Sequence, residues 1–267
     1  MGHAVVYGAG ASVTVFVVAV TAVHLTRALA VSPRRVTTWG AHRGLFLDPR
    51  SAEVVRRHLR RKHLARASAT VLVGSVSWTL AVLSQPTISF LSLPVVLGVL
   101  VAQLLLPEAR RGRVRAVALA HRPSSYFAPR RVLVLVRALF AAGLVLSAAG
   151  VLAGGRWAAE LTVHGAVLLA GLAAMELTLR AISRRGLPDR SDDMALECAL
   201  RVADARAVVA AGLVMSGIGL WFGTSLALAS HASVVLLVFG VVGNVLIPGL
   251  VVGAVALTVP LRQWQPT

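Results

Sequence analysis

Seven long apolar runs, with arginine-rich connections after the first, third and fifth, constrain this 267-residue chain more than any other feature. A helix needs about 20 predominantly apolar residues to cross the hydrocarbon core of a bilayer. Runs near or above that length cover residues 4–30, 67–84, 88–106, 132–152, 161–179, 207–229 and 232–261. The sequence therefore predicts an all-α fold, a polytopic membrane bundle of seven transmembrane helices.

The composition supports this class. Hydrophobic residues make up 57% of the chain and charged residues only 14%, whereas soluble domains hold about 25% charged residues. A net charge of +17 suggests nucleic-acid binding in a soluble protein, but here the cations lie between apolar runs, so we expect no nucleic-acid partner. The single cysteine, Cys198, excludes an internal disulfide and a thiolate metal cluster.

The distribution of cations predicts the topology. Of the 27 Lys and Arg residues, only Arg156 falls on the side opposite to the other 26. Cationic connections stay in the cytoplasm, so we expect the N-terminus outside and the C-terminus inside. All but one of the cations, Lys62, are arginine, a bias typical of GC-rich bacteria. We therefore expect a multi-pass protein of the bacterial cytoplasmic membrane, in contact with lipid on all sides.

We expect a single integral membrane domain over residues 1–267, with an internal repeat. Residues 22–26 (AVHLT) match residues 174–178 (AMELT), and each is followed by arginines, a surface helix and an Ala-Arg-Ala entry into the next run. The sequence predicts parallel repeats over 4–107 and 161–261, joined by 108–160. Such three-plus-one-plus-three arrangements occur among transporters.

Two helices are expected at the cytoplasmic surface. Asp48 and Pro49 predict an N-cap and first helical position, and the helix that follows suits a surface that lies on anionic lipid headgroups. The alternative is that this helix exposes its basic face to water. Ser191 predicts the start of a second, acidic helix. We expect the two to pair through two sets of side chains: Arg56, Arg57, Arg60 and Arg61 against Asp192, Asp193 and Glu197.

Ionisable residues inside the runs are candidates for a polar membrane site. Glu176 lies in the fifth run, and Arg137 lies at a similar depth in the fourth, so the two side chains are expected to bond. An ion pair of Glu176 with Arg180, four residues later, is the structural alternative. His24 occupies the repeat position of Glu176, and its alternatives are a proton relay and a hydrogen bond to a neighbouring carbonyl.

The seventh run is interrupted by Pro248 close to Asn244. Proline frees a backbone carbonyl one turn earlier, so Asn244 is expected beside a break that lines a polar cavity. A glycine- or proline-interrupted span points to a transporter site. The alternative is close helix packing through Gly249 and Gly253.

Recognisable catalytic and cofactor-binding motifs are absent from the sequence. The sequence holds no Gly-x-Ser-x-Gly elbow, His-Glu-x-x-His motif or P-loop. No histidine pair has the spacing of a zinc or haem site. We therefore expect no metal and no cofactor, and an enzyme is the less favoured class.

The segment DRSDD…ALRVADARA, which leads into the sixth run, resembles uncharacterised multi-pass membrane proteins of GC-rich bacteria. That resemblance implies no known activity. The three-plus-one-plus-three arrangement is similar to that of sugar-efflux transporters with parallel three-helix repeats. Their proline-glutamine signature is absent, since Gln85-Pro86 has the reverse order, and no residue role is carried over.

Two functions follow as hypotheses. The first is a small-solute transporter-like bundle with a cavity near Asn244 and Pro248 and with Glu176 as coupling group. The second is a non-transporting regulatory or assembly subunit, whose cytoplasmic helices bind a soluble partner or another copy of the chain. A transporter requires a polar cavity that reaches mid-membrane, whereas a scaffold has a dry interior and an exposed cytoplasmic face.

Overall fold

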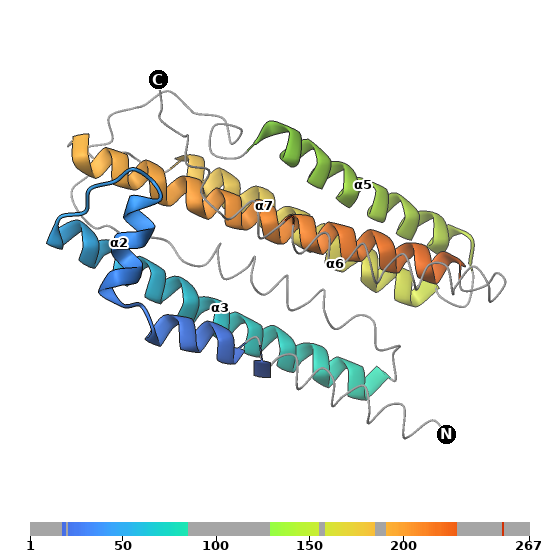
Figure 1. Ribbon diagram of the computed structural model, residues 1–267. Coiled ribbons are helices and arrows are strands. Elements are labelled where there is room, and N and C mark those ends of the chain that lie inside the picture. The colour runs from blue at the N-terminus through green and yellow to red at the C-terminus, as the bar shows by residue number, and fades with distance from the viewer. Residues whose placement is uncertain are drawn as a thin grey trace.

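The computed structural model describes residues 18–19, 21–84, 129–154, 158–184, 191–228 and 253, and all regular structure within them is helical. Residues 21–29 form a helical segment. The five labelled helices are α2 (Pro33–Ala41), α3 (Pro49–Ser84), α5 (Arg130–Leu152), α6 (Ala158–Arg184) and α7 (Ser191–Leu228). Figure 1 shows α5, α6 and α7 side by side, with α3 and α2 on the other side of α7.

Within the described ranges, three helices are long and apolar enough to cross a membrane: Arg130–Leu152, Ala158–Ser183 and Met194–Thr224. They correspond to the fourth, fifth and sixth predicted runs. The second run, 67–84, is helical as the last part of α3. The third and seventh runs lie outside the described residues, apart from Gly253, as does most of the first run.

The predicted boundary between a surface helix and the following span is wrong in both α3 and α7. No break separates the two parts, because α3 continues for 36 residues and α7 for 38. At 1.5 Å rise per residue these helices are about 54 and 57 Å long, far more than the roughly 30 Å hydrocarbon core. Because α3 is continuous from Pro49 to Ser84, its first half cannot lie flat while its second half crosses a membrane.

The predicted helix starts are confirmed. Helix α3 begins at Pro49, and the Ser51 backbone N–H donates to Asp48 Oδ1 at 2.8 Å, which is the expected N-cap bond. Helix α7 begins at Ser191. In Figure 1 these two starts lie at the same end of the molecule as α2. This end is called the arginine-rich end below.

The main core lies between α5, α6 and α7, and α7 is the most buried of the three. Glycines on one helix accommodate long side chains of the next. A Cβ on Gly171 of α6 would overlap the Met215 side chain of α7, and a Cβ on Gly212 would lie 2.6 Å from Met175 Sδ. This reciprocal fit brings the helix backbones close together, as small residues do in membrane helix pairs.

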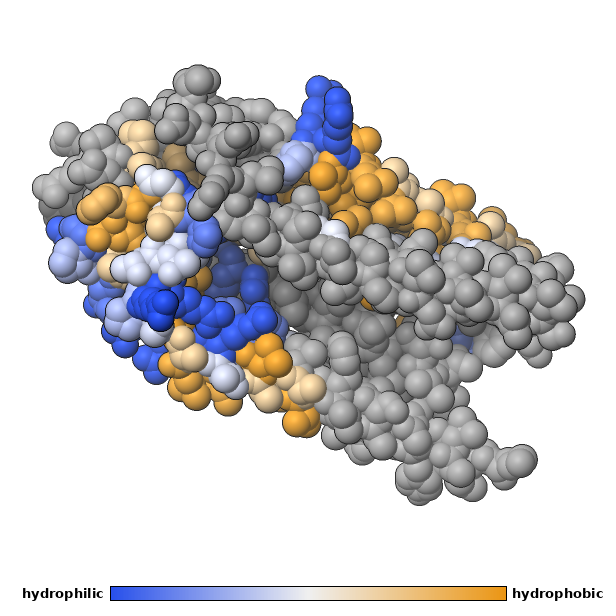
Figure 2. Space-filling view, in the orientation of Figure 1, coloured by the Kyte–Doolittle hydropathy of each residue, from blue (hydrophilic) through white to orange (hydrophobic). Residues whose placement is uncertain are grey.

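A second, smaller core lies at the arginine-rich end. It joins Val36 of α2 and Val55 of α3 to Leu196 and Leu200 of α7. Figure 2 shows hydrophilic residues gathered over α2 and the adjoining part of α3, whereas α5 exposes mainly hydrophobic residues. The described structure therefore has an apolar bundle and a charged end that share the long helix α7.

Candidate anion-binding site

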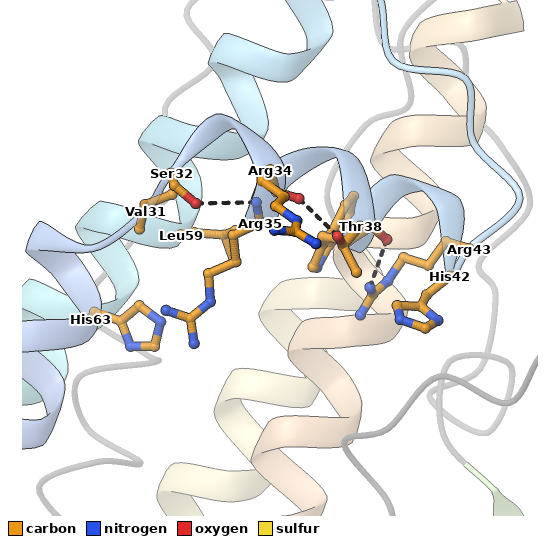
Figure 3. Close-up of a pocket in the computed structure, with 10 residues that line it drawn as sticks. Val31, Ser32, Arg34, Arg35, Thr38, His42, Arg43, Leu59 and His63 are labelled. Carbon is orange, nitrogen blue, oxygen red and sulfur yellow. Dashed lines mark hydrogen bonds between the residues drawn. The ribbon is translucent and has the colours of Figure 1, made fainter.

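A cavity of about 670 Å³ lies between α2 and α3 (Figure 3). Among the described residues, its lining carries three arginines and two histidines and includes no carboxylate: Arg34, Arg35, Arg43, His42 and His63. This cavity is called the arginine pocket. Arginine offers up to five donors in a planar fork that matches phosphate and carboxylate groups. The composition of the lining therefore favours an anionic ligand.

The local sequence of α2 shapes this pocket. Ser32 accepts a hydrogen bond from the Arg35 backbone N–H, and Pro33 takes the first helical position. Val36 faces the smaller core, which turns the neighbouring arginines toward the pocket. After the helix, Gly44 adopts φ of 66°, and Leu45 N–H donates to Gly40 O at 3.0 Å. A left-handed glycine commonly ends a helix in this way, and here it returns the chain toward α3.

Arg43 is a fixed cation of the pocket. Its guanidinium lies 4.1 Å from the centre of the Trp39 ring, and Nη1 donates to Trp39 O at 3.1 Å. Burial lowers the pKa of Arg43 to about 10, with a contribution from the positive charge of Arg206. The guanidinium still carries its charge at neutral pH. A half-buried cation held this way gains from a nearby anion.

His63 lies beside Arg35 in Figure 3. Burial, and then the charges of Arg66, His24, Arg27 and Arg35, lowers the pKa of His63 to about 4, so its ring is neutral at pH 7. Among the described residues no carboxylate forms an ion pair with Arg34 or Arg35. The charges that act on His63 are all positive, and this local field favours an anion.

Two faces of α3 link the pocket to α7. Leu59 and His63 line the pocket, whereas His58 and Lys62 contact Asp204 of α7. His58 Nε2 lies 3.5 Å from Asp204 Oδ1, and Lys62 Nζ donates to the same oxygen. Residues four apart lie on the same side of a helix, so one turn of α3 contacts both the pocket and α7. These contacts to Asp204 are called the Asp204 junction.

The expected pairing of the two charged helices is present, but through other side chains. Arg56 and Arg57 bind Glu53 of their own helix, and Arg60 and Arg61 are exposed. Glu197 accepts from Arg201 at 3.1 Å within α7. The side chains of Asp192 and Asp193 lie outside the described residues. Exposed arginines gain little from pairing in water, whereas Val55, Leu196, Leu200 and Asp204 bring α3 and α7 together by burial.

The expected bond between Arg137 and Glu176 is present. Arg137 Nε and Nη2 donate to Glu176 Oε1 and Oε2 at 2.7 and 3.0 Å, which joins α5 to α6. This bidentate geometry is the strong form of the arginine–carboxylate pair. Among the described contacts Glu176 bonds Arg137 on α5, so the ion pair with Arg180 is not needed to explain it.

The structure describes some of the other candidate residues and not others. His24 stacks on His63 with ring centres 6.0 Å apart, so it adjoins the arginine pocket and not the Arg137–Glu176 pair. His164 is buried in the bundle, with Nδ1 2.9 Å from Ser147 Oγ. Asn244 and Pro248 lie outside the described residues. No group of metal-ligating side chains converges in the described part.

Sequence reasoning missed α2 as a functional element. The signal was available, because Ser32-Pro33 has the same cap-and-proline pattern as Asp48-Pro49 and is followed directly by Arg34 and Arg35. The pocket itself was not predictable in this way. Its second wall comes from residues about 25 positions later in the chain.

These features define an α-helical protein with helices suited to a membrane and a cationic cavity at one end. No protein-family model, curated protein or solved structure matches the chain.

Proposed function

We propose that this protein is a multi-pass component of the bacterial cytoplasmic membrane, with its arginine-rich end in the cytoplasm. Three helices have the length and apolarity of membrane spans, and 26 of the 27 cationic side chains belong to the side predicted as cytoplasmic. The short connections between α5, α6 and α7 reverse the chain direction twice. This alternation suits the proposed threading.

We propose further that the protein is a regulatory or assembly component that binds an anionic partner in the arginine pocket. The observation that carries this proposal is a cavity whose described lining holds three arginines and two histidines and no carboxylate. The described bundle interior, by contrast, is filled by apolar side chains such as Phe140, Leu168 and Met215. In the described part of the chain, an apolar bundle core beside an open cationic site fits a binding component better than a solute pathway.

The Asp204 junction connects the arginine pocket to the bundle. Leu59 and His63 face the pocket, and His58 and Lys62 of the same turn contact α7. Because α7 continues as one helix into the bundle core, a displacement of α3 on binding acts on the helix that α5 and α6 contact. Binding at the arginine-rich end is in this way coupled to the membrane helices.

A small-solute transporter is the second candidate. One observation favours it, the Arg137–Glu176 pair between two helices suited to span a membrane, since ionisable residues in spans mark substrate or proton pathways. Solute uptake by proteoliposomes that is lost in Glu176→Gln, with the protein still folded, would support this function over the first.

Cysteine protection tests the first proposal. A Cys198→Ser protein with His42→Cys places a single thiol in the arginine pocket. Membrane-impermeant maleimide should label this thiol in inside-out vesicles and not in right-side-out vesicles. Sodium pyrophosphate should slow the labelling several-fold in comparison with sodium chloride at equal ionic strength, because a bound polyanion covers the thiol.

The matched control is Thr37→Cys in the same background, an exposed position of α2 outside the pocket lining. Its labelling should not respond to pyrophosphate. Equal protection at both positions, or none at position 42, contradicts the proposed anion site. Labelling at position 42 only in right-side-out vesicles contradicts the orientation.

A further inference from the structure

The arginine pocket lies at the depth expected for lipid headgroups. The first predicted run ends at residue 30, and Val31 and Ser32 directly line the pocket. On the opposite wall, His63 precedes the predicted span that begins at Ala67 by four residues, or about 6 Å of helix. Both walls therefore meet the pocket within about one helical turn of the proposed bilayer boundary.

The walls of the pocket combine charged and apolar side chains. Arg34, Arg35 and Arg43 supply guanidinium groups, whereas Val31 and Leu59 contribute apolar surface and belong to the smaller core. A volume of about 670 Å³ falls in the range of cavities that hold a whole organic ligand, and it exceeds what a single inorganic phosphate fills. The cavity therefore suits a phosphate group attached to an apolar body.

Resting on the function proposed above, we propose that the pocket binds the phosphate headgroup of an anionic membrane lipid. Guanidinium groups of Arg34, Arg35 and Arg43 contact the phosphate oxygens, where bidentate hydrogen bonds are strong. The glycerol and upper acyl chains lie along Val31 and Leu59. A phosphate monoester such as that of phosphatidic acid, with up to two charges, binds more tightly than a singly charged phosphodiester.

The local chemistry disfavours a nucleic acid as the ligand. Single-stranded nucleic acids are bound by aromatic side chains on which bases stack. The pocket lining holds one aromatic ring of that kind, Trp39, and Arg43 already covers one of its faces. A lipid phosphate needs no stacking platform.

Thermal unfolding in lipid nanodiscs tests the proposal with the full-length protein. Four conditions are compared: phosphatidylcholine alone, phosphatidylcholine with phosphatidylglycerol, phosphatidylcholine with phosphatidic acid, and phosphatidylcholine with soluble glycerol phosphate. Anionic lipid should raise the unfolding temperature by several degrees, most with phosphatidic acid, because a ligand that binds only the folded state stabilises it. Soluble glycerol phosphate should produce little change.

The double variant Arg34→Gln/Arg35→Gln should lose most of this lipid-dependent increase. Its control, Arg60→Gln/Arg61→Gln, removes the same charge from exposed positions of α3 outside the pocket and should keep the increase. If the first double variant does not fold, Arg35→Gln alone replaces it, and retention of phosphatidic acid is read by native mass spectrometry.

The outcomes separate this proposal from the one on which it rests. An equal increase with soluble glycerol phosphate identifies a soluble ligand, which overturns the lipid assignment and leaves the anion site intact. Equal loss in both double variants shows a general surface-charge effect and overturns the lipid site. Failure of pyrophosphate to protect position 42, together with no lipid effect, overturns both proposals.

Discussion

The bundle of α5, α6 and α7 and the arginine-rich end of α2 and α3 are held together by different physics. In the bundle, glycines and long apolar side chains interlock over the length of three helices. At the arginine-rich end, a small core of five buried residues and the Asp204 junction hold α2 and α3 against α7. Few contacts mean low local stability. The comparison indicates a more rigid three-helix bundle and a more adaptable arginine-rich end.

The largest effect is expected from Asp204→Asn. Lys62 and Asp204 are both nearly fully buried, and removal of one partner of a buried ion pair costs about 3–5 kcal/mol because the other charge remains. Hydrogen exchange should accelerate in α2 and in residues 49–72, whereas α5 and α6 should keep their protection. Uniform acceleration through all helices would mean that the two regions unfold as one unit.

The double variant Lys62→Met/Asp204→Leu is the control for charge. It replaces the pair by apolar side chains, so it should restore much of the stability that Asp204→Asn loses. If the double variant is less stable than Asp204→Asn, the ion pair and its hydrogen bonds stabilise the protein by more than the cost of leaving one buried charge unpaired.

Substitutions at adjacent leucines test the interlocked bundle. Leu168 is 0% exposed and Leu169 is 57% exposed. Leu168→Ala opens a cavity beside Gly143 and Gly219 and should lower the free energy of unfolding by about 3 kcal/mol. Leu169→Ala should change it by less than about 1 kcal/mol. Denaturant unfolding in mild detergent measures both, and equal losses would contradict the described core.

Glu176→Gln should have a smaller effect. It removes one charge of the Arg137–Glu176 pair, whose side chains are 45% and 26% exposed in the chain alone, and interhelical hydrogen bonds in membranes contribute about 1 kcal/mol. A double-mutant cycle with Arg137→Gln isolates the coupling between α5 and α6. An unchanged unfolding temperature in Glu176→Gln counts against a stabilising pair.

At neutral pH the smallest effect is expected from His63 at the arginine-rich end. The pKa of His63 is lowered from 6.5 to about 4 in the folded protein, chiefly by burial. As the pH falls below about 6.5 the unfolded chain binds this proton first, so stability declines between about pH 6.5 and 4. His63→Gln should flatten this decline in thermal unfolding scans. Identical slopes in both proteins would show that His63 does not set it.

Local sequence signals predicted much of the helical structure. Asp48-Pro49 and Ser191 mark the chain positions where α3 and α7 begin. The depth of Arg137 and Glu176 along their runs predicted a contact that the structure contains. These signals succeed because capping, helix rise and charge depend on neighbours in the chain. The internal repeat, the threading and the transport hypothesis stay predictions.

Contacts between residues far apart in the chain could not be predicted from the sequence. Arg56, Arg57, Arg60 and Arg61 looked like the partners of the acidic helix because their charges are complementary. The partners in the structure are instead Val55, His58 and Lys62. Charge content does not reveal which face of a helix is buried, and the buried face determines which charges meet.

The sequence by itself determined that the chain is helical and apolar, where several helices start, and in which connections the arginines gather. Each of these follows from residue type and spacing along one segment. Only the tertiary structure decided that surface and spanning segments fuse into long helices, that Asp204 contacts Lys62, and that α2 and α3 enclose a cationic cavity. Those outcomes depend on which side chains exclude water together, and that is a property of segments far apart in the chain.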